Sequence, residues 1–151
     1  MKKIKNRQNT SKLLSLLLIV LMMFSFAACG KEVTKEEEKT IWSDATYTSD
    51  TSLGEGEKNF TFKVTAGDKS VNFDIQTDEE TVGDALEELS LISGEEGDYG
   101  LYVKYVNGIY ADYDENATYW AFYVNGEMAP AGVDMTEIED GASYEMLYTK
   151  G

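Results

Sequence analysis

Histidine is absent from this 151-residue sequence, and cysteine and proline each occur once. Without histidine, neither a Ser-His-Asp triad nor a Cys-His pair can form, and no imidazole can coordinate a metal. The lone cysteine, Cys29, cannot form a disulfide within the chain, so stability must come from packing. Gly-rich phosphate loops and thiolate metal sites are missing too. These absences predict a binding protein rather than an enzyme, with no cofactor and no metal.

Basic residues are few and concentrate at the N-terminus. Five of the 13 lie within residues 1–12, ahead of an apolar run over residues 13–26. The run is too short to span a bilayer comfortably, and its basic flank gives it the layout of a secretory signal peptide.

The end of this segment, Phe26-Ala27-Ala28-Cys29, resembles the lipobox of bacterial lipoproteins, with phenylalanine in place of the usual leucine. The resemblance implies that residues 1–28 are a lipoprotein signal peptide and that Cys29 is acylated and becomes the mature N-terminus. The alternative is an ordinary secretory signal with an unmodified thiol nearby. We therefore expect a lipid-anchored protein of the cell membrane, facing the extracellular or periplasmic side.

Acidic residues dominate the remaining chain. Segment 1–28 carries five of the 13 basic residues and none of the 28 acidic ones, so its removal leaves 8 against 28, a net charge of −20. Such a surface repels nucleic acid phosphates and anionic headgroups, which excludes both as ligands. The charge needs no specific ligand to explain it, because a soluble exported domain in a salty medium would carry it as well.

Residues 29–57 have the composition of a flexible acidic tether. They include the run Glu36-Glu37-Glu38 and few apolar residues, so the segment buries too little surface to offset its ordering entropy. As a coil it would span about 30 Å. Trp42 and Tyr47 interrupt the pattern; they either begin a short strand that docks on the domain or form an exposed sticky patch.

Residues 58–151 are predicted to form one folded domain. Alternating apolar residues predict strands over residues 60–66, 71–76, 101–105, 119–124 and 144–148. Helical spacing predicts a helix over residues 81–92, capped by Thr81 and ended by Gly94. A hairpin, a helix and then more strands is the order of an α+β, β-grasp-like fold, in which a mixed sheet wraps one helix.

The strand 119–124 is the most strongly patterned. It ends in Asn125-Gly126, a pair favoured in tight hairpin turns. Alternation places Trp120, Phe122 and Val124 on a core face, and it places Tyr119 and Tyr123 on the opposite face.

Five short motifs recur in a characteristic order: Thr81–Leu86, Tyr105–Gly108 followed by Ala111-Asp112, Tyr119–Gly126, Pro130–Val133 and Asp140-Gly141. In this order they resemble the transcobalamin-like C-terminal domain. That domain is the β-domain of transcobalamin and intrinsic factor, and it has uncharacterised relatives in bacterial lipoproteins. The resemblance covers residues 60–150 and implies a β-grasp-like fold and contact with a corrinoid.

The chain departs from the mammalian carriers in three respects. It lacks the helical barrel that supplies much of their site, no histidine can reach cobalt, and Ala142 replaces an acidic residue common in relatives. The resemblance therefore implies half a binding site, a wall built from Tyr110, Tyr119, Tyr123, Asn125 and Met128. The alternative is that the tyrosines are cross-strand pairs that stabilise an exposed sheet face.

The run Asp112–Asn116 resembles the start of an EF-hand loop. However, Ala117 replaces the required glycine and Tyr123 replaces the closing glutamate, so a solvated loop is favoured over a weak calcium site.

The function predicted from all these features is a surface-anchored binding module. It would capture cobalamin, another corrinoid or a small amphipathic ligand for uptake, with a membrane transporter or surface protein as partner. The alternative is a protein-interaction or adhesion module without a small-molecule ligand.

Overall fold

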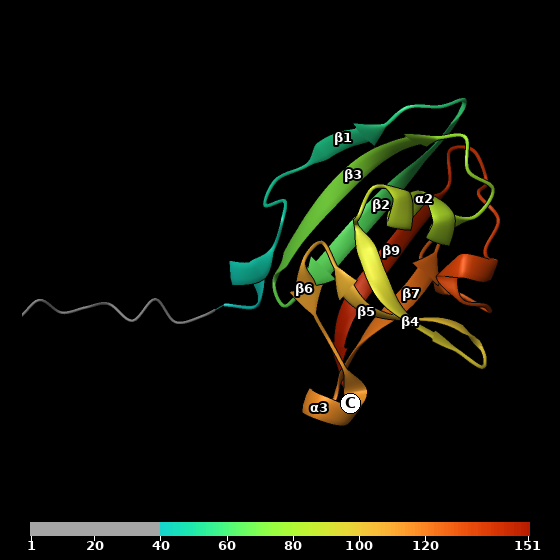
Figure 1. The fold of residues 1–151 in the computed structure, drawn as a ribbon. Coiled ribbons are helices and arrows are strands. Elements are labelled where there is room, and N and C mark those ends of the chain that lie inside the picture. Colours follow the sequence, from blue (N-terminus) through green and yellow to red (C-terminus); the bar gives the residue numbers. More distant parts are fainter. Residues whose placement is uncertain (1–39) are drawn as a thin grey trace, which may run out of the picture. The chain divides into compact units, whose positions relative to one another are not determined.

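Residues 40–151 are described in a computed structural model (Figure 1). The strands are β1 (Thr51–Gly54), β2 (Lys58–Ala66), β3 (Lys69–Thr77), β4 (Ile92–Gly97), β5 (Gly100–Val106), β6 (Ile109–Tyr110), β7 (Thr118–Val124), β8 (Glu127–Met128) and β9 (Ser143–Lys150). The helices are α2 (Val82–Glu88), α3 (Tyr113–Asn116) and the 3₁₀ turns η1 (Ile41–Asp44) and η2 (Val133–Met135). The expected signal peptide and Cys29 lie outside the described residues.

The strands form two sheets. The larger is mixed and has the order β1-β3-β2-β9-β7-β8, in which β1 runs parallel to β3 and β2 runs parallel to β9. The smaller has the order β4-β5-β6 and is antiparallel. The predicted hairpins β2–β3 and β7–β8 are both present, and the α+β class is confirmed. The second sheet is an addition, because the sequence predicted a single sheet.

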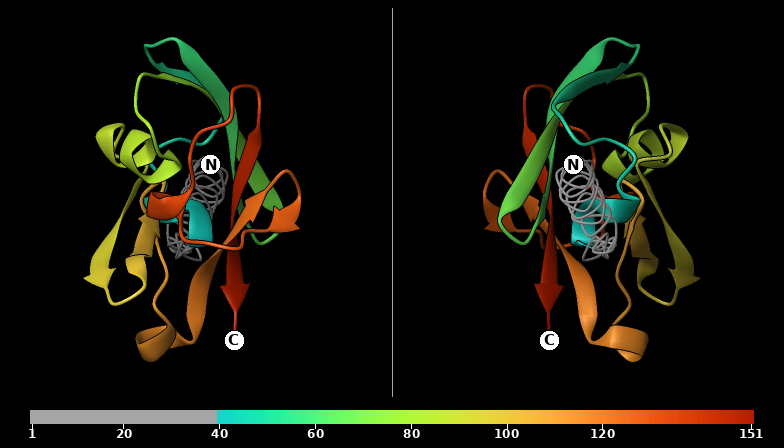
Figure 2. Two further views of the ribbon diagram at one scale, coloured as in Figure 1. Left: turned by 90° about the vertical axis from the view of Figure 1, so that its right-hand side faces the viewer. Right: turned by 90° about the vertical axis from the view of Figure 1, so that its left-hand side faces the viewer.

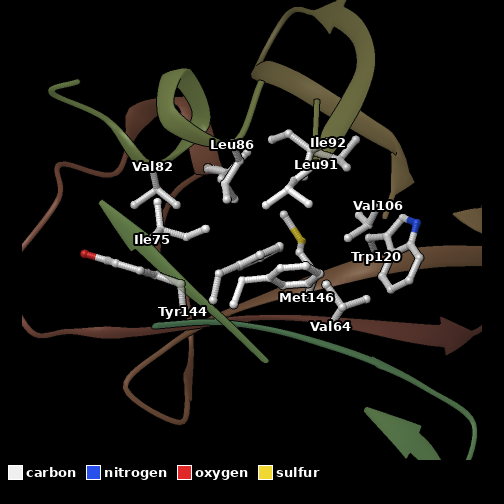
Figure 3. Packing of buried hydrophobic residues seen from close by; sticks show 14 of the residues in the cluster. Val64, Ile75, Val82, Leu86, Leu91, Ile92, Val106, Trp120, Tyr144 and Met146 are labelled. Atoms are coloured by element: carbon white, nitrogen blue, oxygen red, sulfur yellow. The ribbon is translucent and has the colours of Figure 1, made fainter. Parts of the chain in front are cut away.

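The core lies between the larger sheet and a layer made of α2 and the smaller sheet. Figure 2 shows these elements on one side of the larger sheet. The apolar faces of β2, β3, β7 and β9 point into this core, where Leu86 and Leu91 meet Met146 and Val64 (Figure 3). Trp120 is buried, and Phe122 and Val124 pack against the cluster, as alternation along β7 predicted. Tyr144 is buried completely, and its hydroxyl accepts a hydrogen bond from the Glu139 N–H.

The helix α2 is shorter than predicted. Its start is as expected, because the Thr81 side chain accepts a hydrogen bond from the Asp84 N–H and donates one to the Asp84 carboxylate. It ends at Glu88 rather than at residue 92, and Ser90 adopts a left-handed φ of 55°. Ile92 therefore begins β4 instead of completing a helical stripe. Gly94 is not a helix terminator but lies in β4, next to a bulge.

Residues 40–57 belong to the fold, whereas the sequence predicted a flexible tether through residue 57. The Trp42 indole N–H donates to the Ala66 carbonyl at 2.8 Å, and Lys69 lies over the Trp42 ring. Tyr47 packs edge-on against Phe73. Docking of these aromatic residues is thus confirmed, although Trp42 lies in a 3₁₀ turn rather than a strand. β1 follows them and adds an edge to the larger sheet.

Between residues 40 and 151, no helix combines the length and apolar character needed to cross a membrane.

Candidate functional site

The outer face of the larger sheet carries an apolar strip along β7 and its neighbours. Alternation places Tyr119, Ala121 and Tyr123 on this face, where the Tyr113 ring of α3 lies 6.5 Å from the Tyr119 ring between centroids and Ala121 is 7% exposed. Strand pairing then adds Met128 opposite Tyr123 and Leu147 opposite Ala121. These five residues form what we call the aromatic strip. The two tyrosines are half-buried, and Met128 is 68% exposed.

The strip has a polar border on β9 and β2, where Glu145 lies opposite Tyr123 and pairs with Lys63. Lys63 forms an ion pair with Glu145 at 3.3 Å, and the Thr65 hydroxyl donates to the same carboxylate at 2.6 Å. Because Lys63 and Thr65 both bind the Glu145 carboxylate, these three side chains are held in place. A ligand on the strip would therefore meet ring faces and a thioether on one side and a charged edge on the other.

Asn125 holds the hairpin at the end of the strip. Its φ is 50°, its N–H donates to the Ser143 carbonyl at 2.7 Å, and its side-chain oxygen accepts from the Ser143 N–H at 3.0 Å. Both bonds tie the turn to β9. The structure therefore gives Asn125 a positioning role at the candidate site.

A hollow of about 430 Å³ lies beside this hairpin, lined by Val124, Asn125, Glu127, Met128 and Pro130. This volume falls within the range of small-molecule pockets, about 300–1,000 Å³. Met128 belongs to both the hollow and the strip. The two features are therefore adjacent at Met128, while Val124, which also lines the hollow, lies on the opposite face of β7 from the tyrosines.

Tyr110 does not lie with the other predicted site residues. It belongs to β6 in the smaller sheet, where its ring packs against that of Tyr105 at 4.9 Å between centroids. Of the five residues predicted from the sequence, the structure brings together Tyr119, Tyr123, Asn125 and Met128. Leu147 joins them, and only the register between β7 and β9 reveals it.

Tyr110 instead borders a charge network on the smaller sheet. Lys104 forms ion pairs of 2.9 Å with both Glu95 and Asp112, and the Tyr110 hydroxyl donates to Asp112 at 3.3 Å. The Lys104 ammonium holds the pKa of the Asp112 carboxyl below its ordinary value. Hydrogen bonds to Glu95 and Asp112 in turn raise the pKa of Lys104.

The same network includes Asp112, the first residue of the EF-hand-like run Asp112–Asn116, and engages its carboxylate. One Asp112 oxygen accepts from the Asp114 and Glu115 N–H groups and caps α3, and the other faces Lys104. Both oxygens of Asp112, the first residue of the run, are thus bound to donors of the chain. Among residues 40–151, no three histidine, cysteine, aspartate or glutamate side chains gather into a set that could hold a metal ion.

We predict a late-ionising tyrosine from this geometry. Burial, then a hydrogen bond to Glu115 and the charge of Asp112, raises the pKa of Tyr110 to about 12. A raised pKa contributes stability that is complete below the ordinary tyrosine value of about 10 and is lost as the pH rises toward 12. An absorbance titration of tyrosinate should contain a component near pH 12 that Tyr110→Phe removes. A titration curve unchanged by Tyr110→Phe would contradict this environment.

A second hollow, of about 370 Å³, lies at the other end of the larger sheet. It is lined by Ser52, Leu53, Gly54, Asn59, Phe60, Thr61, Asp74, Ile75 and Gln76. Residues 52–54 form part of β1, which the sequence did not predict, so this hollow could not be anticipated. Its open side is polar and offers no tyrosine or tryptophan ring, so it suits a flat amphipathic ligand less well than the aromatic strip does.

Comparison with known proteins supplies three findings. A crystal structure at 1.30 Å resolution from Ruminococcus gnavus ATCC 29149, described as a "putative metal binding protein", shares 33% identity with this chain at a TM-score of 0.59. The match covers 63% of this chain and 99% of that protein. Haptocorrin in complex with Cbi shares 18% identity at a TM-score of 0.52, which shows a common fold. Residues 79–150 match the family described as Domain of unknown function (DUF4430).

The haptocorrin match covers 62% of this chain but only 25% of haptocorrin, so the similarity concerns a minor part of that protein. No curated protein sequence matches this chain. The fold expected from the transcobalamin-like resemblance is therefore found, and through residues 79–150 the chain belongs to the DUF4430 family.

Proposed function

We propose that this protein is a lipid-anchored surface module that binds a flat amphipathic ligand, a corrinoid or a molecule of similar shape, and does not transform it. The observation that carries the proposal is the aromatic strip, in which two half-buried tyrosines, a leucine and an exposed methionine lie beside a hollow. Sites for small molecules are commonly apolar surfaces with a few placed polar groups, and the border on β2 and β9 supplies those groups.

The geometry of the strip suits a flat ligand. Tyr119 and Tyr123 lie four residues apart on one strand, roughly 13 Å at the usual rise of a strand. Ala121 lies between them and is 7% exposed, so a planar ring system resting across the row would contact the two tyrosine rings rather than the alanine. The haptocorrin-like fold supports this choice of ligand class.

An open strip covers only one side of a ligand. Haptocorrin is about four times as long as the part that this chain matches, so much of that protein has no counterpart here. We propose that a membrane transporter covers the other side of the ligand and receives it for uptake. Acylation at Cys29 would keep the module close to such a partner.

Titration of the full chain in detergent with cobalamin or cobinamide tests the proposal. Isothermal calorimetry and tyrosine fluorescence should both report saturable binding. Tyr119→Ala and Tyr123→Ala should each weaken binding roughly three- to tenfold, because each removes one stacking ring.

Tyr99→Ala is the matched control, since Tyr99 lies in the β4–β5 turn and is 92% exposed. The affinity of this variant for the corrinoid should stay within about twofold of the wild type, which is the usual scatter of surface substitutions. Absence of saturable binding at millimolar ligand would exclude direct capture by this chain. An equal loss in all three variants would remove the strip as the site.

A protein-interaction module is the second candidate, and the edge of the larger sheet favours it. β8 pairs with Tyr123 and Val124, and the Ala129 N–H donates to the Phe122 carbonyl at 3.0 Å, so within residues 40–151 no strand pairs with this side of residues 118–121. Such an edge is a template for an added strand from another protein. A stoichiometric partner recovered from solubilised membranes without any corrinoid would favour this candidate. Recovery only with ligand would favour the first.

A further inference from the structure

A second aromatic surface lies on the smaller sheet and α3. It consists of Tyr102, Tyr105, Tyr110 and Tyr113, which we call the tyrosine patch. Tyr105 and Tyr113 are 46% and 57% exposed, and Tyr102 is exposed as well. Single exposed rings are scattered on ordinary protein surfaces and need no explanation. Exposed aromatic residues that gather on one surface, in contrast, indicate an interaction site.

The rings of the patch are held in place. Tyr105 and Tyr110 are directly opposed across β5 and β6, with ring centroids 4.9 Å apart. The Tyr102 hydroxyl accepts a hydrogen bond from the Tyr113 N–H at 3.1 Å, which ties β5 to α3. A partner would therefore lose little conformational entropy in ordering these side chains.

The charge around the patch is strongly negative. Residues 92–116 contain six acidic residues and one lysine, Lys104. That lysine is 18% exposed and is paired with Glu95 and Asp112, so it presents little free positive charge. Asp114 and Glu115 are exposed on α3 beside Tyr113. The surface therefore combines ring faces with uncompensated carboxylates.

The chain itself shows which group fits such a surface. The Lys104 ammonium lies 5.8 Å from the centre of the Tyr102 ring while it contacts two carboxylates. Cations bind to aromatic faces through the ring quadrupole, and neighbouring carboxylates add Coulomb attraction. Tyr105 packs against Tyr110 and Tyr113 against Tyr119, and the exposed parts of the Tyr105 and Tyr113 rings offer the same pair of interactions to an incoming cation.

We propose that the tyrosine patch binds a segment of another protein that is rich in arginine and lysine. The two hollows described above lie elsewhere, so this open surface would leave a small organic cation largely in water. A polypeptide can place several cations along β5, β6 and α3 at once. Charge complementarity favours this partner over an acidic or neutral segment.

The test uses the full chain in detergent and a short synthetic arginine-rich peptide. Calorimetry at low salt should show saturable binding that weakens as salt is added. Replacing both exposed rings, Tyr105→Leu with Tyr113→Leu, leaves the charge unchanged and should weaken binding about tenfold, since two cation–π contacts are lost. Tyr105→Phe with Tyr113→Phe keeps both ring faces and should keep the affinity.

Two controls separate this surface from the rest of the molecule. Glu87→Gln with Glu88→Gln removes two exposed charges from α2, and Tyr123→Ala alters the aromatic strip; both should leave peptide affinity within about twofold of the wild type. Circular dichroism confirms that each variant is folded. Peptide affinity that is unchanged in the variant with Tyr105→Leu and Tyr113→Leu would overturn the proposal. Peptide affinity that falls as much in the Glu87→Gln, Glu88→Gln variant would also overturn it, because the binding would then be attraction to bulk charge.

Other occupants of the patch have their own outcomes. Choline binding as tight as peptide binding would assign the patch to small cations instead. Self-association of the chain that is lost in the leucine pair would assign it to a second copy. Either result would overturn the polypeptide assignment, while saturable peptide binding that depends on the two rings would support it.

Discussion

Replacing Asn107 with alanine should lower the free energy of unfolding by about 3 kcal/mol, the sum of two lost hydrogen bonds, two orphaned backbone groups and a strained turn. The Asn107 side chain is completely buried in the turn between β5 and β6. Its oxygen accepts from the Tyr47 N–H at 2.8 Å, and its nitrogen donates to the Tyr47 carbonyl at 2.8 Å. The Asn107 side chain thus binds the backbone N–H and carbonyl of Tyr47, as a neighbouring strand would.

The cost has two sources. Alanine would leave both backbone groups of Tyr47 without a partner in a half-buried position, and a lost partner is more costly there than at the surface. Position 107 also has a φ of 51°, which asparagine tolerates better than alanine. Urea unfolding at neutral pH measures the effect. Hydrogen exchange should show that residues 40–50 open first, because Asn107 links them to the smaller sheet.

Asn125→Ala is the matched control. Asn125 also precedes a glycine in a hairpin turn and has a φ of 50°, but it is exposed. Its side-chain oxygen accepts one bond, from the Ser143 N–H. We expect a loss of about 1 kcal/mol, typical of one surface hydrogen bond and a turn preference. Equal losses for the two asparagines would contradict the role of Asn107 as a link between the segments.

These two asparagines show where sequence reasoning succeeds and where it stops. Both Asn-Gly pairs predict tight turns, and both turns are present with positive φ at each position. Nothing local distinguishes the buried asparagine from the exposed one. The distinction depends on Tyr47, which lies 60 residues away in the chain.

The same limit explains the errors in secondary structure. Leu86, Leu89 and Ile92 continue a helical spacing, but Ser90 has a left-handed φ of 55°, which interrupts the helix, and Ile92 then pairs with Val106 of β5. β4 has the sequence Ile-Ser-Gly-Glu-Glu-Gly, which shows no alternation and little strand propensity. It forms because β5 offers it a partner, and such pairing is a tertiary effect.

In the candidate site, too, some contacts follow from local sequence and others depend on long-range strand pairing. The Asn125-Gly126 turn fixes the pairing of Tyr123 with Met128, so that contact follows from local sequence. Leu147 enters the strip only through the register of β7 and β9. Tyr110 leaves it because β6 joins the smaller sheet. Which sheet a strand joins depends on long-range pairs such as Phe62 with Tyr144, and alternation alone does not encode them.

Replacing Gly83 with alanine should also be strongly destabilising, by about 2–3 kcal/mol, as expected for a methyl group forced into a filled space. The sequence alone predicts the opposite sign, because alanine is the better helix former by about 1 kcal/mol. Gly83 lies in the first turn of α2 and is buried. A Cβ at this position would lie 2.7 Å from the Asp134 Cα and 2.9 Å from the Asp134 nitrogen.

The contact cannot relax cheaply, since its atoms belong to the backbone of η2. Val133, the first residue of η2, is buried in the core, and the Val82 N–H donates to the Thr136 carbonyl at 2.9 Å. These two anchors hold η2 against α2 on both sides of the clash. To admit a methyl group, one of the anchors must loosen.

Urea unfolding measures the loss, and Glu87→Ala is the control. Glu87 is exposed in the same helix, so its replacement should change the free energy of unfolding by no more than about 0.5 kcal/mol. A Gly83→Ala variant more stable than the wild type would mean that helix propensity outweighs packing here and that η2 is not held against α2. A destabilised variant would show that α2 and η2 are packed too closely to admit a methyl group. The loop that carries Pro130 runs directly into η2 and lines the hollow beside the aromatic strip, so the same packing would link α2 to that loop.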